Sequence, residues 1–104
     1  MKTLVIKKGD TGEAITAVLK RKGKAEKLTN KTVKFCMSNG LEAYAQVIDA
    51  ENGIVMYPIE DTFFNELGFF SGEFKVTYED GRVLSFPDGD FIPIRIIEGA
   101  DGNG

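Results

Sequence analysis

Residues 68–86 read GFFSGEFKVTYEDGRVLSF, and this stretch decides the fold class. From Phe70 to Tyr78 the apolar residues fall on alternate positions, which is the period of a half-buried β-strand. Asp80-Gly81 follows and is a strong signal for a two-residue hairpin, because both central positions of the favoured turn need a positive φ. The apolar run after it returns as the second strand of that hairpin.

The rest of the chain follows the same plan, with short apolar runs separated by turns rich in Gly, Asn and Asp. Asn52-Gly53 is a second hairpin signal. Pro93 indicates that the last strand lies at a sheet edge or is locally bulged, because proline cannot donate to a ladder. The further strands that we expect cover residues 3–7, 14–20, 32–37, 43–48, 54–57 and 91–97.

These strands predict an all-β chain folded as one antiparallel β-sandwich or small barrel. Their short lengths and the turn spacing favour an immunoglobulin-like antiparallel β-sandwich of seven to eight short strands. Residues 61–67 can form one helical turn, whose Phe63, Phe64 and Leu67 would plug the core. We expect a single sandwich domain over residues 1–98 and a flexible Gly-rich tail over residues 99–104.

The composition removes several common classes of active site. The 104 residues include no histidine, which zinc sites, His-assisted triads and most general acid–base chemistry use. Cys36 is the single cysteine, so no disulfide can form within the chain, and we interpret it as an inert thiol on a strand. No apolar run approaches the ~18 residues of a membrane helix, and we expect a soluble, intracellular chain without cofactor or metal.

Charge is distributed unevenly along the chain. Residues 1–34 carry ten Lys/Arg and three Asp/Glu, a net charge of +7, and residues 35–104 carry a net charge of −10. The densest basic group, Lys20-Arg21-Lys22-Gly23-Lys24, could bind nucleic acid or could be a solvated hairpin tip. We favour the hairpin tip, because most aromatic residues that would stack on bases lie in the acidic part. Head-to-tail packing of basic and acidic parts between copies is a third interpretation.

Two other features are candidate sites. Asp88-Gly89-Asp90 places two carboxylates in one loop, which could hold calcium if Asp10 or Asp80 approached, or could serve a small hydrolase if both carboxylates converged in a pocket. An acidic surface turn is the plainer interpretation. Phe69 points away from Phe70 by alternation, and an exposed Phe69 beside Phe63 or Phe64 would mark a partner surface.

The order of several motifs resembles one known family. The motifs are TLVIKKGDT at residues 3–11, LT at 28–29, TVKF at 32–35, V-x-D-x-x-x-G-x-V-x-Y at 47–57, GFF and GEFKVTYEDG within 68–81, SFP at 85–87 and IPI at 92–94. This order is similar to the immunoglobulin-like domain at the N-terminus of phage baseplate upper proteins and to small tail proteins of siphophages and prophages. Pro58, Phe70 and Gly72 depart from the family pattern, which has a tyrosine at the position of Phe70 and an alanine at that of Gly72.

The resemblance implies a non-enzymatic structural component of a phage or prophage tail or baseplate, located in the virion and in the host cytoplasm during assembly. Its partners would be other tail proteins or further copies of itself, with no nucleic acid and no membrane. The alternative is a carbohydrate- or cell-surface-binding immunoglobulin-like module, which predicts exposed aromatics on one sheet face. Candidate contacts are the edge strands 3–7 and 91–97 and the residues Lys20, Arg21, Lys22, Lys24, Phe69, Phe91 and Pro93.

Overall fold

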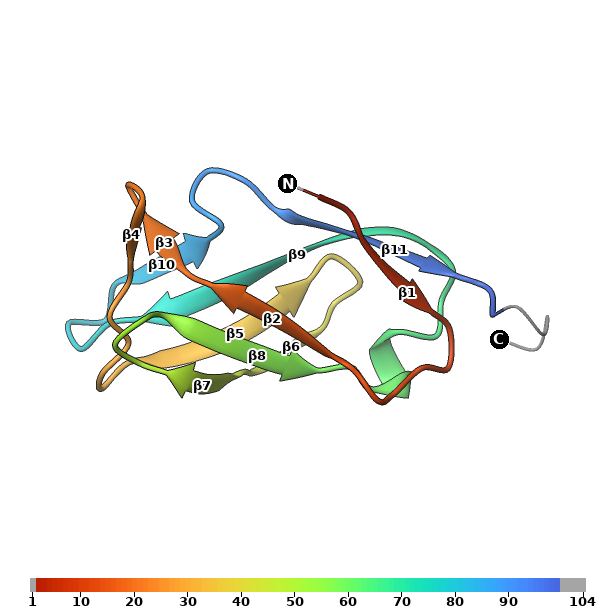
Figure 1. The fold of residues 1–104 in the computed structure, drawn as a ribbon, viewed down its shortest axis with the longest axis horizontal. Coiled ribbons are helices and arrows are strands. Elements are labelled where there is room, and N and C mark those ends of the chain that lie inside the picture. The colour runs from red at the N-terminus through yellow and green to blue at the C-terminus, as the bar shows by residue number, and fades with distance from the viewer. Residues whose placement is uncertain (1, 100–104) are drawn as a thin grey trace.

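The computed structural model describes residues 2–99, and it confirms the all-β sandwich (Figure 1). The larger sheet has the order β1 (Leu4–Lys7), β11 (Ile92–Ile97), β9 (Gly68–Thr77), β5 (Thr32–Met37) and β6 (Glu42–Tyr44), and β10 (Val83–Phe86) also pairs with β9. The smaller sheet has the order β2 (Ala14–Val18), β8 (Ile54–Pro58) and β7 (Gln46–Asp49). A separate hairpin joins β3 (Lys20–Arg21) to β4 (Lys24–Ala25).

The core lies between the two sheets and consists of the inward-facing residues of each strand. Phe35 on β5 is fully buried, and its ring stacks on Tyr57 of the opposite sheet with the centroids 5.2 Å apart. The ring of Phe74 on β9 lies 5.1 Å away on the same side of the core as Phe35. Large aromatic side chains therefore fill the interior of a chain that contains no tryptophan.

The β9–β10 hairpin forms where the sequence predicts it, but its loop is one residue longer. The Tyr78 N–H donates to the Arg82 carbonyl, and the Gly81 N–H donates to the Tyr78 carbonyl, which leaves three residues in the loop. Gly81 has a φ of 90°, whereas Asp80 is not among the residues with positive φ. The loop is closed by one left-handed residue, Gly81, so only this position requires the positive φ that glycine adopts easily.

The strand expected over residues 43–48 is two strands in two sheets. β6 belongs to the larger sheet and β7 to the smaller one, and Ala45 lies between them. The Ala45 N–H still donates to the Val33 carbonyl, so the chain leaves the larger sheet immediately after this residue. Alternation of side chains does not record such a crossing, because both halves keep the period of two.

The last strand, β11, is not an edge strand, and this corrects the expectation drawn from Pro93. It lies between β9 and β1, and its pairing with β1 is parallel. Pairing with β1 begins at Ile94, one residue after Pro93, which stands opposite Ser71 of β9. The missing N–H of the proline is tolerated because the ladder with β1 has not yet begun at that residue. The end strands of the larger sheet are β1 and β6.

The segment after β8 contains a single short 3₁₀ turn, η1 (Asp61–Phe63). Phe64 is buried in the core and Phe63 packs against it, as expected. The expectation for Leu67 is wrong, because this side chain is 47% exposed. Residues 100–104 of the expected tail lie outside the described residues, and the domain boundary at residue 98 stays a prediction.

Candidate interaction surfaces

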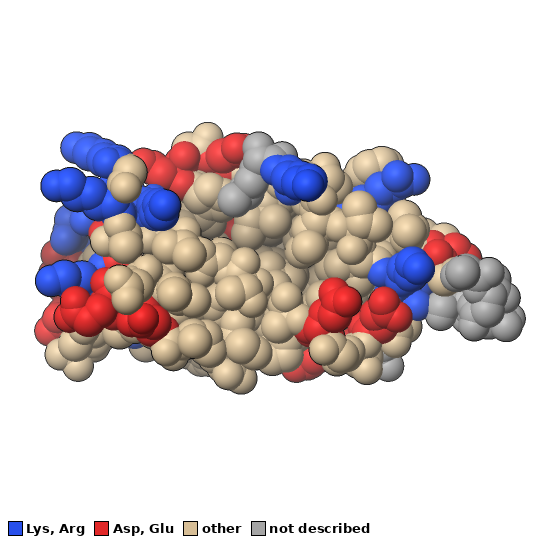
Figure 2. Space-filling view, in the orientation of Figure 1, with Lys and Arg blue, Asp and Glu red and all other residues tan. Residues whose placement is uncertain are grey.

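The four basic residues of the first candidate site lie together on the β3–β4 hairpin, at one end of the sandwich (Figures 1 and 2). The pairs Lys20–Ala25 and Arg21–Lys24 leave Lys22 and Gly23 as the two turn residues, with φ values of 54° and 81°. Both central residues are therefore left-handed, which is the requirement for a two-residue hairpin turn. We call this element the basic hairpin.

The basic hairpin is held against the core by a buried polar cluster. Glu26 is only 8% exposed, accepts a hydrogen bond from the Tyr78 hydroxyl and forms an ion pair of 3.2 Å with Arg21. Burial, and then the hydrogen bond to Glu26, raises the pKa of Tyr78 to about 12. The Glu26 N–H donates to the Leu19 carbonyl, so side chain and backbone both hold the hairpin in place.

The other cations of the basic hairpin remain available to a ligand. No ion pair within residues 2–99 engages Lys20, Lys22 or Lys24. A depression of about 430 Å³ opens beside them, and its rim is predominantly basic. It is lined by Arg21, Lys24, Ala25, Glu26, Lys27, Lys31 and Tyr78. Four cations against one carboxylate suit an acidic partner.

Phe69 is the most exposed large apolar residue on the larger sheet. Its side chain is 77% exposed and points away from the core, as alternation predicts. The guanidinium of Arg95, its neighbour on β11, lies 5.3 Å from the ring centroid. Val5, which stands opposite Arg95 on β1, is 53% exposed. Phe69 is therefore flanked by Arg95 rather than by Phe64, which lies in the core.

Phe91 directly precedes β11 and Pro93 is the second residue of that strand, away from the basic hairpin. Phe91 is 54% exposed and helps to line a shallow depression of about 330 Å³ that also includes Cys36 and Glu73. Partial burial raises the pKa of the Cys36 thiol, which disfavours the thiolate form. The structure thus does not bring the predicted contact residues into one continuous surface.

The acidic loop at Asp88 and Asp90 does not assemble a metal site. Across residues 2–99, no group of three or more His, Cys, Asp or Glu side chains is arranged to hold a metal ion. Asp80, one of the carboxylates considered for such a site, forms an ion pair of 2.8 Å with Arg82. An Asp90 carboxylate oxygen accepts the Phe91 N–H, as in an ordinary loop.

The outer face of the smaller sheet is uncharged apart from Asp49, which stands opposite Ile54 after a bulge in β7, and no expectation drawn from the sequence concerned this face. Register and alternation place uncharged residues there from all three strands, and Figure 2 shows the middle of this face free of blue and red. They are Ala14, Thr16, Val18, Gln46, Ile54, Met56 and Pro58, and Ile48 is the extra residue of the bulge, without a register partner on β8. The signal was present, because residues 14–18 and 54–58 contain no charge on either face, a pattern typical of strands covered on both sides.

A groove of about 550 Å³ runs along the open side of β2. Every residue of β2 lines it, and Lys2, Leu4 and Ile92 lie along it as well. β2 pairs only with β8, so the groove borders the free edge of the smaller sheet. This edge was also absent from the predicted contacts, because strand order cannot be read from the local pattern.

Among the comparisons with known proteins, only the comparison with solved structures finds a similarity. No protein-family model matches this sequence, and no curated protein sequence matches it either. The fold is similar to a solved structure described as the N-terminal domain of phage TP901-1 ORF48, with a TM-score of 0.73. The alignment covers 94% of this chain and 86% of that chain, at 20% sequence identity. The two proteins share a fold.

None of the helical structure described is long and apolar enough to span a membrane.

Proposed function

We propose that this protein is a non-enzymatic structural component of a phage or prophage tail or baseplate and serves there as a protein–protein docking module. The observation that carries the proposal is the fold likeness to a phage protein domain over 94% of the chain. The order of sequence motifs, which resembles that of phage baseplate upper proteins, supports the same role independently. On this view the protein acts in the virion, and during assembly in the host cytoplasm.

The basic hairpin is the docking element with the clearest chemistry. Lys20, Lys22 and Lys24 project from a backbone that the Arg21–Glu26 pair and the Tyr78 hydroxyl hold in place. A preformed element loses little conformational entropy on binding, so it can recognise acidic side chains of a neighbouring tail protein at low cost.

The direct test is mass spectrometry of phage-like particles purified after induction of the source strain. We expect this chain in intact tails at a fixed stoichiometry to the other tail proteins. Its absence from particles, with abundant protein in the soluble fraction, would overturn the proposed function.

Charge reversal tests the docking element itself. Lys20→Glu with Lys22→Glu should lower incorporation into particles, because like charges would then face an acidic partner. Arg21 is left unchanged, since its loss would leave the Glu26 carboxylate without its ion pair. The matched control is Lys7→Glu with Lys8→Glu, which makes the same change in charge at the end of β1. Unchanged incorporation of the hairpin variant would remove the basic hairpin from the docking surface.

Exposed aromatic side chains support a second candidate function, which is the binding of carbohydrate or a cell surface. Tyr44 is 69% exposed and Phe69 is 77% exposed, both on the outer face of the larger sheet. β6, which carries Tyr44, is separated from β9 by β5, so the two rings do not form one platform. A glycan array probed with the native chain and with Tyr44→Ala and Phe69→Ala variants tests it. Glycan binding that the substitutions abolish would favour this function.

A further inference from the structure

We propose that two copies of this chain pair antiparallel through the free edges of β2, which joins their two three-stranded sheets into one continuous sheet. The inference does not depend on the proposed function, because it concerns association of the chain with itself. It follows from three features of β2: its unpaired backbone, the groove beside it and the charges at its two ends.

The backbone of β2 presents unused donors and acceptors. The Leu19 N–H donates to the Gly53 carbonyl, and the Glu13 carbonyl accepts from the Ile59 N–H. Odd-numbered residues of this strand therefore face β8, and the N–H and C=O groups of Ala14, Thr16 and Val18 face the open side. No backbone hydrogen bond within the described part of the chain engages these groups. Such an edge is a template for another strand.

The space beside this edge is open and apolar. The groove of about 550 Å³ extends along all five residues of β2, and the side chains of Leu4 and Ile92 lie along it. β1 therefore does not cover the edge, although it belongs to the neighbouring edge of the larger sheet (Figure 1). A strand added here would satisfy the open backbone groups and cover apolar side chains together.

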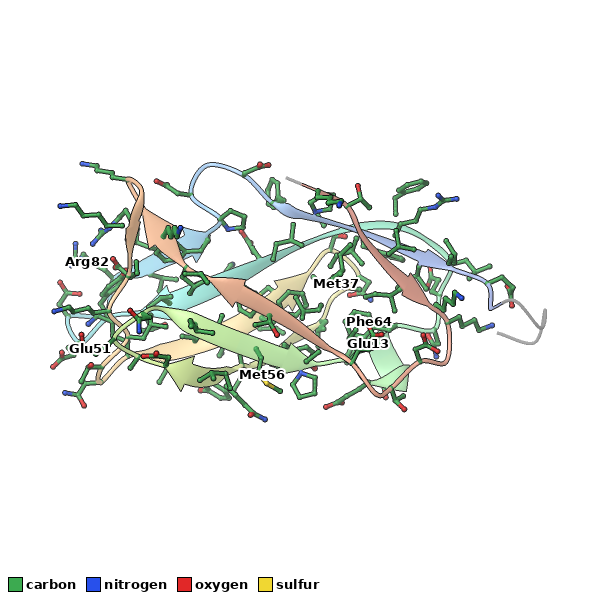
Figure 3. All side chains as sticks on the ribbon, viewed as in Figure 1. Glu13, Met37, Glu51, Met56, Phe64 and Arg82 are labelled. Atoms are coloured by element: carbon green, nitrogen blue, oxygen red, sulfur yellow. The ribbon has the colours of Figure 1, made fainter. Side chains whose placement is uncertain are left out.

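The charges at the ends of β2 select a second copy in the antiparallel direction. Asp10 and Glu13 precede the strand, and Lys20 and Lys22 follow it. Figure 3 shows Glu13 at the end of β2 remote from the basic hairpin. No ion pair within residues 2–99 uses any of these four side chains.

Antiparallel pairing centred on Thr16 sets Gly12 of one copy opposite Lys20 of the other. The acidic end of each strand then lies beside the basic end of its partner, twice over because of the two-fold symmetry. A parallel arrangement would instead bring like charges together. The sequence thus supplies both halves of a complementary, self-matching edge.

The interface is small, and the dimer should be weak. Five strand residues span about 17 Å, and such an edge buries less than the ~1,600 Å² of a standard stable complex. We expect a dissociation constant for the dimer in roughly the micromolar to millimolar range. Sedimentation equilibrium over that range should show the mass rising from 11.4 kDa towards twice that value.

The first variant is Thr16→Pro, which removes an outward-facing N–H without breaking a bond to β8. It should remain monomeric at every concentration. The matched control is Val5→Pro on β1, where the Lys8 N–H to Ile97 carbonyl bond shows that the Val5 N–H also faces away from its neighbour. This control should dimerise like the native chain, and circular dichroism checks that both variants are folded.

A charge-swap set decides the question even where the proline variant fails to fold. Lys20→Glu with Lys22→Glu should weaken dimerisation at least tenfold, and so should Asp10→Lys with Glu13→Lys. The chain carrying all four changes should regain dimerisation, because opposite charges again face each other, with the acidic and basic ends of β2 exchanged. A native chain that stays at 11.4 kDa throughout, or a four-change chain that remains as weak as its parents, would overturn the proposal.

Discussion

At the residue scale, Tyr78 and Glu26 form a buried polar contact between the end of β9 and the basic hairpin. The buried carboxylate of Glu26 has two partners in this cluster, the Tyr78 hydroxyl and the Arg21 guanidinium. Tyr78→Phe removes the hydroxyl and should lower the free energy of unfolding by about 1–3 kcal/mol, because a buried acceptor loses a donor. Urea denaturation measures the change. The exposed Tyr44→Phe is the matched control, and an equal loss in both variants would contradict the assignment.

The same contact makes stability depend on alkaline pH. Folding raises the pKa of Tyr78 from 10.0 to about 12, so the folded state holds this proton more tightly than the unfolded state does. The stabilisation that comes from this raised pKa is complete below pH 10 and is lost as the pH rises towards 12. The free energy of unfolding should fall over that range by up to about 1.4 kcal/mol per pH unit. Urea denaturation at several alkaline pH values should show this slope reduced in Tyr78→Phe.

Gly72 shows at the residue scale why this chain departs from the motif that it resembles. A Cβ at this position would lie 2.8 Å from Cζ of Phe35 and 3.0 Å from Cδ1 of Ile94. Phe35 cannot easily move, because its ring is fully buried against Tyr57 and Phe74.

Gly72→Ala should therefore cost about 1–3 kcal/mol of stability through overpacking. Gly12→Ala, where nothing lies within 4 Å of the added Cβ, is the matched control. Thermal unfolding of the two variants compares them. A Gly72→Ala protein as stable as the control would show that the core adjusts freely around Phe35.

At the scale of elements, the turn between β7 and β8 joins the smaller sheet to the basic hairpin. The Gly53 carbonyl accepts from Leu19, and a Cβ on Gly53 would lie 2.8 Å from the carbonyl oxygens of both Leu19 and Glu26. These are backbone atoms, and the φ of Gly53 is 67°, so crowding and strain act together.

Gly53→Ala should destabilise the protein by clearly more than Gly81→Ala, which has a φ of 90° but no atom within 4 Å of the added Cβ. The strain alone costs about 1–3 kcal/mol, and the difference between the variants measures the crowding. Chemical denaturation provides both values. Equal losses would mean that the Leu19 and Glu26 backbone moves aside.

At the scale of the whole molecule, surface chemistry is divided between ends and faces. The basic hairpin occupies one end, and the middle of the outer face of the smaller sheet is uncharged (Figure 2). The outer face of the larger sheet carries Phe69 and Arg95. Particle incorporation depends on the first surface in the proposed function, and self-association depends on the open backbone of β2 together with the charges at its ends, which include Lys20 and Lys22. Thr16→Pro in the particle assay separates the two roles, because it leaves the hairpin charges unchanged.

Local pattern determined much of this fold. The alternation in β5 and β9 places Phe35, Phe74 and Val76 in the core, and the exposed Phe69 followed from the same alternation. The Lys20–Lys24 group was correctly interpreted as a hairpin tip. These features could be predicted because a strand has a side-chain period of two and a tight turn has a small set of backbone solutions.

Only the tertiary structure decided how the strands are ordered and which edges stay open. Pro93 indicated an edge strand, yet β11 is enclosed by β1 and β9, and Ala45 carries the chain between sheets without any change of period. The groove beside β2 depends on the positions of Leu4 and Ile92, and Ile92 lies far from β2 in the chain. Strand order depends on long-range packing, and a local sequence pattern contains no information about which distant strand will lie alongside.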